Sequence, residues 1–166
     1  MKFADLANGT AVFVDANTFV YAFSPHAQLG PPSEKLLERI EHHELSGSTS
    51  THVLSDVAHR LMTLEACAAY GWPFAGIAQR LSRHPAEVKQ LSRYRQAIDA
   101  ILAIGFQVLS SNARHIPAAT AISHQHGLLT NDALIVALMQ ESGMLHLASN
   151  DGDFDLVAGI TRYAPL

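Results

Sequence analysis

The 166-residue chain is 48% hydrophobic and 16% charged, which suits one domain with a sizeable core and excludes a disordered or fibrous protein. Its formal net charge of −4 argues against a surface dedicated to nucleic acid, because phosphate binding relies on basic residues. No apolar run is long enough to cross a bilayer, no signal peptide is recognisable, and the single cysteine, Cys67, fits a reducing cytosol. We therefore expect a cytoplasmic protein folded as one domain over residues 1–166.

Short apolar runs alternate with helical patterns along the whole chain. Continuous runs of this length are typical of strands buried on both faces of a parallel sheet. The expected strands are residues 11–14, 45–48, 106–109, 146–148 and 160–163. The expected helices cover 18–23, 33–44, a stretch after 51, 85–105, 113–125 and the apolar run 133–139. This order predicts one α/β domain with a mostly parallel central sheet flanked by helices.

The first expected strand ends abruptly in Asp15, followed by Asn17. In open α/β sheets, binding sites lie just outside the carboxyl ends of the strands. Both side chains also serve well as caps of a following helix. Asp15 therefore either caps a helix or begins a functional site, and other carboxylates at the same place would favour the site.

Asp56 is an anomaly in the helix after residue 51. Its spacing from Val53 and Val57 places it inside or at the edge of the apolar stripe, where an unpaired carboxylate is costly. It therefore needs a partner, a metal ion or access to water. His52 and His59 lie on nearly the same helix face, so a His-Asp-His metal site is a second interpretation.

Two further groups of acids stand at element ends. Asp132 lies in the first turn of the apolar helix, where a carboxylate is stabilised by free N–H groups. Asp151, Asp153 and Asp155 directly follow the expected strand 146–148, where they repel one another unless a cation or solvent separates them. A simple Asp-Gly turn is the alternative for this segment.

Asp15, Asp56, Asp132 and Asp151 can converge where strand ends and helix ends meet. An oxygen-only cluster suits a hard divalent cation, Mg²⁺ or Mn²⁺, rather than zinc. Such a cation leaves positions for water and for a phosphate oxygen. The sequence therefore predicts metal-dependent hydrolysis of a phosphodiester.

These segments resemble the successive motifs of a PIN domain, in particular the VapC-type toxins of toxin–antitoxin pairs. The matching stretches are residues 12–17, the Asp56 helix, 130–134 and 148–154. The resemblance implies a PIN-like sandwich of a parallel sheet between helices, endoribonuclease activity with Mg²⁺ or Mn²⁺, a homodimer and a cognate antitoxin. Many members carry glutamate where this chain has the shorter Asp56.

The resemblance also assigns roles to residues. It makes Asp15, Asp56, Asp132 and Asp151 the metal-binding and water-activating acids. Of these, we expect Asp15, Asp132 and Asp151 to hold the metal and Asp56 to orient a ligand or water. The supporting residues are Asn17, Ser149 and Asp153.

Two other functions stay open at this point. A haloacid-dehalogenase-like phosphatase would use an aspartate after the first strand as nucleophile, but needs a second aspartate where Asn17 stands. A catalytically weak module that binds a basic peptide in its acidic pocket is the other alternative, and the short Asp56 favours it.

Basic residues are concentrated in one part of the chain. Five of the eleven lysines and arginines fall within residues 80–95, namely Arg80, Arg83, Lys89, Arg93 and Arg95. They form either the solvated face of a helix or a local rim that contacts phosphate, and the sequence does not separate the two.

Overall fold

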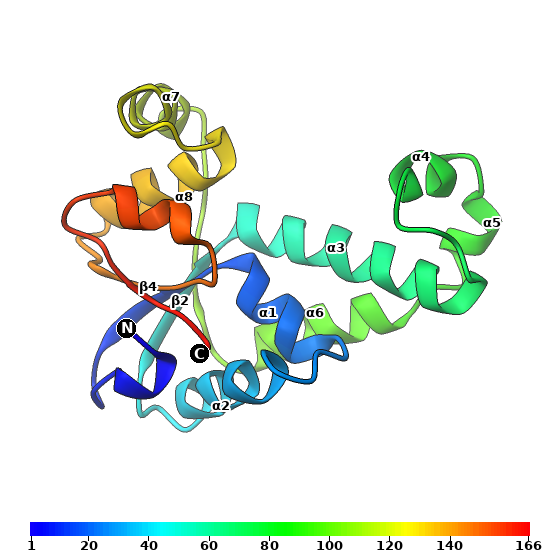
Figure 1. Ribbon diagram of the computed structural model, residues 1–166, viewed down its shortest axis with the longest axis horizontal. Coiled ribbons are helices and arrows are strands. Elements are labelled where there is room, and N and C mark those ends of the chain that lie inside the picture. Colours follow the sequence, from blue (N-terminus) through cyan, green and yellow to red (C-terminus); the bar gives the residue numbers. More distant parts are fainter.

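A five-stranded sheet, parallel throughout, forms the centre of the protein in a computed structural model that describes residues 1–166 (Figure 1). The strand order is β3-β2-β1-β4-β5. The strands are β1 (Ala11–Val14), β2 (Ser46–Ser50), β3 (Gln107–Leu109), β4 (His146–Ala148) and β5 (Thr161–Tyr163). All five predicted strands are present, with β2 shifted toward the C-terminus, and the expectation of a mostly parallel sheet is confirmed.

Helices cover both faces of the sheet. Figure 1 shows α7 and α8 on one side and α1, α2 and α6 on the other, which is the predicted three-layer sandwich. The helices are η1 (Phe3–Asp5), α1 (Ala16–Phe23), α2 (Gly30–Glu41), α3 (Thr51–Tyr70), α4 (Ile77–Ser82), α5 (Pro85–Val88), α6 (Arg93–Ala103), α7 (His115–His126), α8 (Thr130–Glu141) and η2 (Gly152–Leu156). No helix combines the length and the apolarity needed to cross a membrane.

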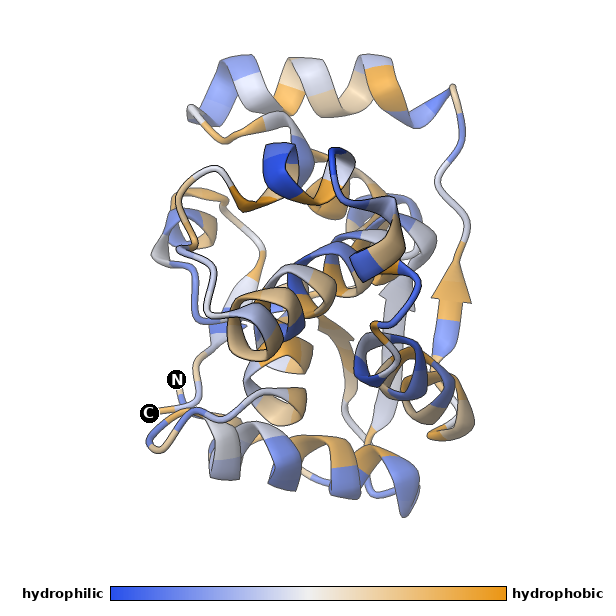
Figure 2. Ribbon diagram, turned by 90° about the vertical axis from the view of Figure 1, so that its right-hand side faces the viewer, coloured by the Kyte–Doolittle hydropathy of each residue, from blue (hydrophilic) through white to orange (hydrophobic).

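The main core lies between the sheet and these helices. Val12, Phe13 and Val14 of β1 are fully buried, as expected for the middle strand of a covered parallel sheet. All seven residues of 133–139 in α8 are buried, which confirms this run as a central helix. In Figure 2 the apolar colour alternates with polar colour along the helices, and one strand is pale because β2 consists of serine, glycine and threonine.

Helix α3 extends beyond this core and carries a lobe at its far end (Figure 1). The lobe comprises residues 71–92, which include α4 and α5. It begins at Gly71, whose positive φ of 63° ends α3 in the left-handed conformation. Its own small apolar cluster, separate from the main core, is formed by Ala66, Ile77, Leu81 and Leu91.

The single helix predicted over 85–105 is wrong. The chain instead forms α5, a break, and α6, which begins at Arg93. The break is stabilised by Glu65 of α3, whose carboxylate accepts N–H bonds from Ser92, Arg93 and Tyr94 at 3.0–3.1 Å. A cap supplied from 27 residues upstream leaves no signal in the local pattern.

Two predicted helix starts are also wrong. Helix α1 begins at Ala16 rather than at residue 18, because Asp15 caps it. Helix α2 begins at Gly30, with prolines in its first turn, and Ser33 donates to the carbonyl of Leu29 at 2.7 Å instead of capping. Prolines suit a first turn because their missing N–H is not needed there.

Candidate active site

The site is organised by the central strand of the sheet, β1, and its neighbour β4. β1 and β4 pair in parallel, with Val14 opposite Ala148, so that Asp15 and Ser149 follow side by side at the same edge. The N–H of Asp15 donates to the carbonyl of Ala148 at 3.1 Å. The strand pairing therefore brings together two side chains that are 134 positions apart.

Asp15 is the buried centre of a hydrogen-bond network. The side chain is almost fully enclosed, with 7% of the residue exposed. Its Oδ1 accepts from the N–H of Ala16 at 2.6 Å, and its Oδ2 accepts from Asn17 Nδ2 at 2.7 Å and from Ser149 Oγ at 2.8 Å. Asn17 and Ser149 thus fix the carboxylate of Asp15 in one orientation.

The same network includes the residues that follow β4. The N–H of Asp151 donates to Ser149 Oγ at 3.0 Å, and the N–H of Asn150 donates to Asn17 Oδ1 at 3.1 Å. Burial raises the pKa of Asp15, and the hydrogen bonds from Ser149 and Ala16 counteract part of that rise. Asp15 is both the helix cap and the centre of the acidic cluster, so the two interpretations of the sequence are compatible.

Asp132 is held differently from Asp15. It lies in the first turn of α8 and is only partly buried, and its carboxylate accepts no hydrogen bond. Burial, together with the negative charges of Asp15, Asp151, Asp153 and Asp56, raises its pKa to about 6. Asp132 therefore lies close enough to four other carboxylates to be repelled by them. This makes it part of the acidic cluster and more than a helix cap.

The three acids after β4 have separate environments. Asp151 caps η2, since its Oδ1 accepts from the N–H of Asp153 at 2.9 Å. Asp153 is exposed beside it. Asp155 forms a two-pronged ion pair with Arg162, at 2.9 and 2.7 Å, so that its charge is neutralised there. Of the three, Asp151 and Asp153 contribute their charge to Asp132.

Asp56 lies at the edge of the apolar face of α3, with both the access to water and the charged partner that its position was predicted to need. Its side chain is 42% exposed and lies 3.7 Å from Arg60 Nη1, one helical turn further along α3. The core-facing positions of this turn are Val53 and Val57. The alternative site of His52, Asp56 and His59 is not assembled in the structure, where Asp56 pairs with Arg60 instead.

Arg60 was not recognised as a site residue in the sequence. It lines a pocket of about 330 Å³ together with Asn17, Tyr21, Asn150, Asp151 and Gly152. Its positive charge lowers the pKa of Asp15, against the larger effect of burial. Its position four residues after Asp56, on the same helix face, is the sequence signal that could have revealed it.

The donor chemistry of the cluster suits a hard cation. All of its ligating groups are carboxylate, amide or hydroxyl oxygens, and the charge repulsion at Asp132 is of the kind that a cation relieves. The side chains, as they stand, are not drawn together into a coordination shell.

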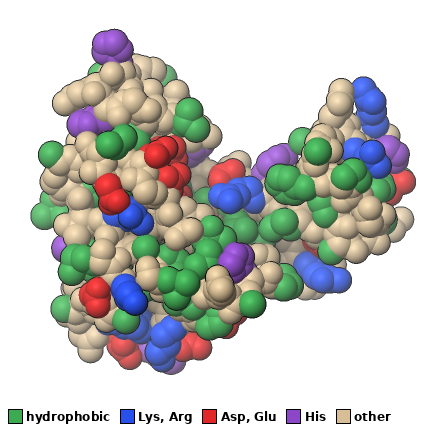
Figure 3. Space-filling view, in the orientation of Figure 1, with side chains coloured by type: hydrophobic (Ala, Val, Ile, Leu, Met, Phe, Trp, Pro, Cys, Tyr) green, Lys and Arg blue, Asp and Glu red, His purple; other side chains and the backbone are tan.

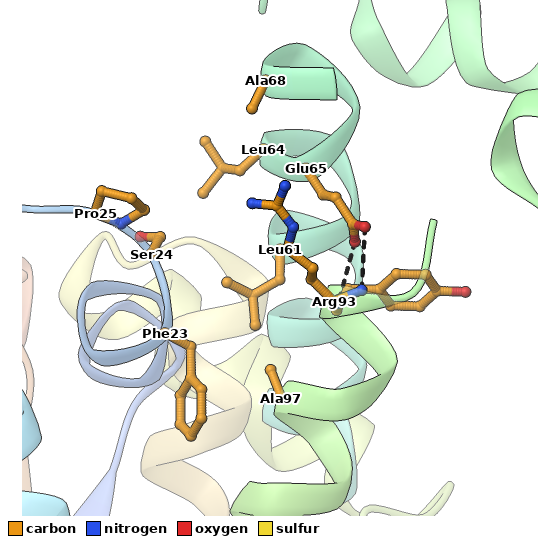
Figure 4. A pocket seen from close by; sticks show the side chains of 10 residues that line it. Phe23, Ser24, Pro25, Leu61, Leu64, Glu65, Ala68, Arg93 and Ala97 are labelled. Carbon is orange, nitrogen blue, oxygen red and sulfur yellow. Dashed lines mark hydrogen bonds between the residues drawn. The ribbon is translucent and has the colours of Figure 1, made fainter. Parts of the chain in front are cut away.

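A second pocket, of about 120 Å³, lies away from the acids between the end of α1 and helices α3 and α6. Figure 4 shows Leu61 and Leu64 of α3 facing Phe23 and Pro25 across it. Its acidic residue, Glu65, is engaged by the backbone of α6, as the dashed lines show. This mostly apolar pocket lies away from the strand-end cluster, where the free carboxylates are gathered.

Comparison with known proteins agrees with this arrangement. The family model described as the PIN domain matches residues 12–160 of the chain. No curated protein sequence gives a match.

Several solved structures share the fold. VapBC2 from Rickettsia felis, bound to a DNA fragment from its promoter, is similar with a TM-score of 0.61 and 15% identity, over 93% of this chain and 98% of that one. VapC20 from Mycobacterium tuberculosis, a sarcin-ricin-loop-cleaving toxin, has a TM-score of 0.58 and 19% identity, over 90% and 96%. A toxin–antitoxin complex from Klebsiella pneumoniae has a TM-score of 0.58 and 14% identity, over 90% and 95%.

Proposed function

Because the chain belongs to the PIN-domain family, we propose that it is a metal-dependent endoribonuclease of the VapC type, the toxin of a toxin–antitoxin pair. The observation that carries the proposal is the convergence of carboxylates on Asp132, whose pKa is raised to about 6. Carboxylates placed so that they repel one another at a sheet edge are a cost to the fold, and a bound cation offsets that cost. Binding of Mg²⁺ or Mn²⁺ would relieve the repulsion between these carboxylates, which supports a metal-binding role for the cluster.

We assign the cation to Asp15, Asp132 and Asp151. When bound, it supplies Lewis-acid polarisation of a phosphate and lowers the pKa of a water. Asn17 and Ser149 keep the carboxylate of Asp15 in place through the 2.7 and 2.8 Å bonds. Asp153 adds negative charge at the entrance, and Asp56 orients water or a ligand from the exposed side of α3.

Arg60 contributes a positive charge to this acidic pocket. It lies in the pocket wall with Asn150 and Asp151, and its present partner, Asp56, is 3.7 Å away and largely solvated. An exposed pair of this kind is weak, so the guanidinium is available to a better acceptor. We infer that Arg60 binds a non-bridging oxygen of the RNA phosphate and positions it in the site.

The remaining partners follow from the same family assignment. Rickettsia felis VapBC2 and the Klebsiella pneumoniae complex are toxins solved with their antitoxins. We propose that this chain likewise pairs with a cognate antitoxin that blocks the acidic site, forms a homodimer and acts in the cytoplasm as a single PIN-like domain over residues 1–166.

A cleavage assay tests the proposal. Total RNA is incubated with the protein in Mg²⁺, in Mn²⁺ and in EDTA, and Asp132→Asn is compared with Asp99→Asn, which alters an exposed aspartate on α6. We expect fragments only with metal, from the wild type and Asp99→Asn. Absence of cleavage with either metal would favour the alternative of an acidic module that binds a basic peptide, which the exposed Asp56 also suits.

A further inference from the structure

The lobe has the opposite charge to the rest of the chain. Its 22 residues contain Arg80, Arg83 and Lys89 but only one acid, Glu87, whereas the whole chain has a net charge of −4. All three basic side chains are exposed. The six ion pairs of the molecule all lie outside the lobe, so that none of its cations is neutralised by a carboxylate.

Aromatic side chains are placed among these cations. The guanidinium of Arg80 lies 5.7 Å from the ring centre of Trp72, whose ring also packs against Tyr70 at 4.8 Å and His84 at 5.0 Å. Phe74, two residues after Trp72, is 66% exposed. Trp72, with Arg80 stacked on it, and the exposed Phe74 therefore present aromatic surfaces to solvent.

A polar pocket of about 350 Å³ opens at the same place. Gln79, Arg80, Arg83 and His84 line it, with Ala75 and Gly76. His84 Nδ1 donates to the carbonyl of Arg80 at 2.7 Å, since a carbonyl only accepts, and this bond holds the imidazole in the wall of the pocket. The two guanidinium groups of Arg80 and Arg83 beside this polar pocket suit a phosphate, with aromatic rings next to it for a base.

The lobe and the acidic site stand at opposite ends of one helix. Fourteen residues separate Asp56 from Tyr70 on α3, a distance of about 20 Å along the helix axis. Arg60 stands between them, on the side that lines the acidic pocket. Figure 3 shows the surface hollowed between body and lobe, with acidic and basic side chains interspersed on the body and mainly Lys and Arg among the charged side chains of the lobe.

We propose that the lobe is a second RNA-binding site, which takes a phosphate in the pocket of Arg80, Arg83 and His84 and stacks an adjacent base on Trp72 or Phe74. This proposal rests on the proposed function, since the strand held by the lobe is the one that the acidic site cleaves. It assigns phosphate contact to Arg80 and Arg83, two of the five basic residues concentrated in 80–95, whereas Arg93 and Arg95 lie outside the lobe on α6. The lobe thus compensates for the repulsion between RNA and an acidic body.

Trp72 is the only tryptophan of the chain and makes the lobe directly observable. A single-stranded RNA oligonucleotide of mixed sequence is titrated into the full-length protein in EDTA, where no metal-dependent cleavage occurs. We expect the RNA to quench Trp72 fluorescence, with a midpoint that rises with salt. Unchanged emission with RNA bound, or no RNA binding at all, would overturn the proposal.

Variants make the test specific for the lobe. In anisotropy measurements with labelled RNA, we expect Arg80→Ala combined with Arg83→Ala to weaken binding about tenfold and to reduce the slope of log K against log salt by about 1.4. The matched control removes two exposed cations of the body, Lys35→Ala with Arg114→Ala, and should stay within about twofold of the wild type. Arg80→Lys with Arg83→Lys should restore the salt slope.

The two proposals fail in different ways. RNA binding at the lobe without any cleavage in Mg²⁺ or Mn²⁺ would refute the ribonuclease and leave the lobe site standing. Metal-dependent cleavage together with wild-type affinity and salt slope in the double alanine variant would refute the lobe site alone. In that case the lobe would be a surface for an acidic protein partner.

Discussion

The acidic site and the lobe are two charged surfaces on one helix, and they are built in different ways. The site stands on the central strands, and its key carboxylate, Asp15, accepts three hydrogen bonds in a nearly closed environment. The lobe rests on a cluster of four buried residues and on the Glu65 cap, and its cations are exposed. If the two proposals hold, cleavage takes place at side chains fixed by the sheet edge, whereas RNA is bound by exposed cations and aromatic rings that need no such fixed positions.

Replacing Asp15 should have the largest effect. Asp15→Ala removes a proposed metal ligand and leaves the donors of Ala16, Asn17 and Ser149 without their acceptor. We expect cleavage to fall more than about 100-fold, because even outer-shell partners of metal ligands are worth 10–100-fold. We also expect the free energy of unfolding to fall by about 3 kcal/mol, measured by urea denaturation. Unchanged RNA affinity at the lobe would show that the lobe acts independently of Asp15. Full cleavage activity would remove Asp15 from the proposed active site.

Arg60 should have a smaller effect on the same assay. Arg60→Ala removes the cation from the acidic pocket, and we expect cleavage at subsaturating RNA to fall about tenfold, as for the loss of one charge-assisted hydrogen bond. Arg60→Lys should recover part of this loss. Arg114→Ala, an exposed arginine of the body, is the control and should cleave like the wild type. An equal loss of cleavage in Arg60→Ala and Arg114→Ala would show that Arg60 acts only through the overall surface charge and does not contact the phosphate.

Glu65 tests the attachment of the lobe. Backbone N–H bonds from Tyr94, Arg93 and Ser92 lower its pKa against the effect of burial, so the folded state holds its proton less tightly than the unfolded state. This stabilisation is present above the unfolded pKa, near 4.5, and is lost as the pH falls through the lower folded value.

At pH 7 we expect Glu65→Gln to lower the free energy of unfolding by about 2 kcal/mol. Below pH 4 the difference from the wild type should shrink. A difference in the free energy of unfolding that does not change with pH would show that α6 is held by packing rather than by the charge of Glu65.

Asp132 should have the opposite effect on stability to Glu65 when metal is withheld, because its ionised form destabilises the folded state. Its pKa is raised to about 6, chiefly by burial, so the folded state binds more protons than the unfolded state between about pH 4 and 6. Wild-type stability in EDTA therefore falls across that range as the pH rises, and Asp132→Asn escapes this loss. We expect the variant to be about 1–2 kcal/mol more stable at pH 7.5 and equal to the wild type at pH 4. A less stable variant at pH 7.5 would mean that the carboxylate is not repelled.

The sequence predicted the features that depend on local pattern. Buried strands, their parallel order and acids at their carboxyl ends are all marked by short apolar runs that stop at Asp15 and Asp151. It did not predict features that depend on contacts between distant residues. The cap from Glu65 to Tyr94 and the place of Arg60 in the pocket wall follow from how α3 packs, which a helical pattern alone leaves open.

The most direct test measures RNA cleavage at the acidic site and RNA binding at the lobe separately in one experiment. Single-turnover cleavage of one RNA oligonucleotide in Mn²⁺, and Trp72 quenching by the same RNA in EDTA, are measured for the wild type, Asp132→Asn and the Arg80→Ala, Arg83→Ala double variant. The account predicts that Asp132→Asn keeps the quenching and loses cleavage, while the double variant needs about tenfold more RNA but cleaves at the wild-type rate once saturated. Cleavage that survives in Asp132→Asn, or that is lost in the double variant at saturating RNA, would contradict it.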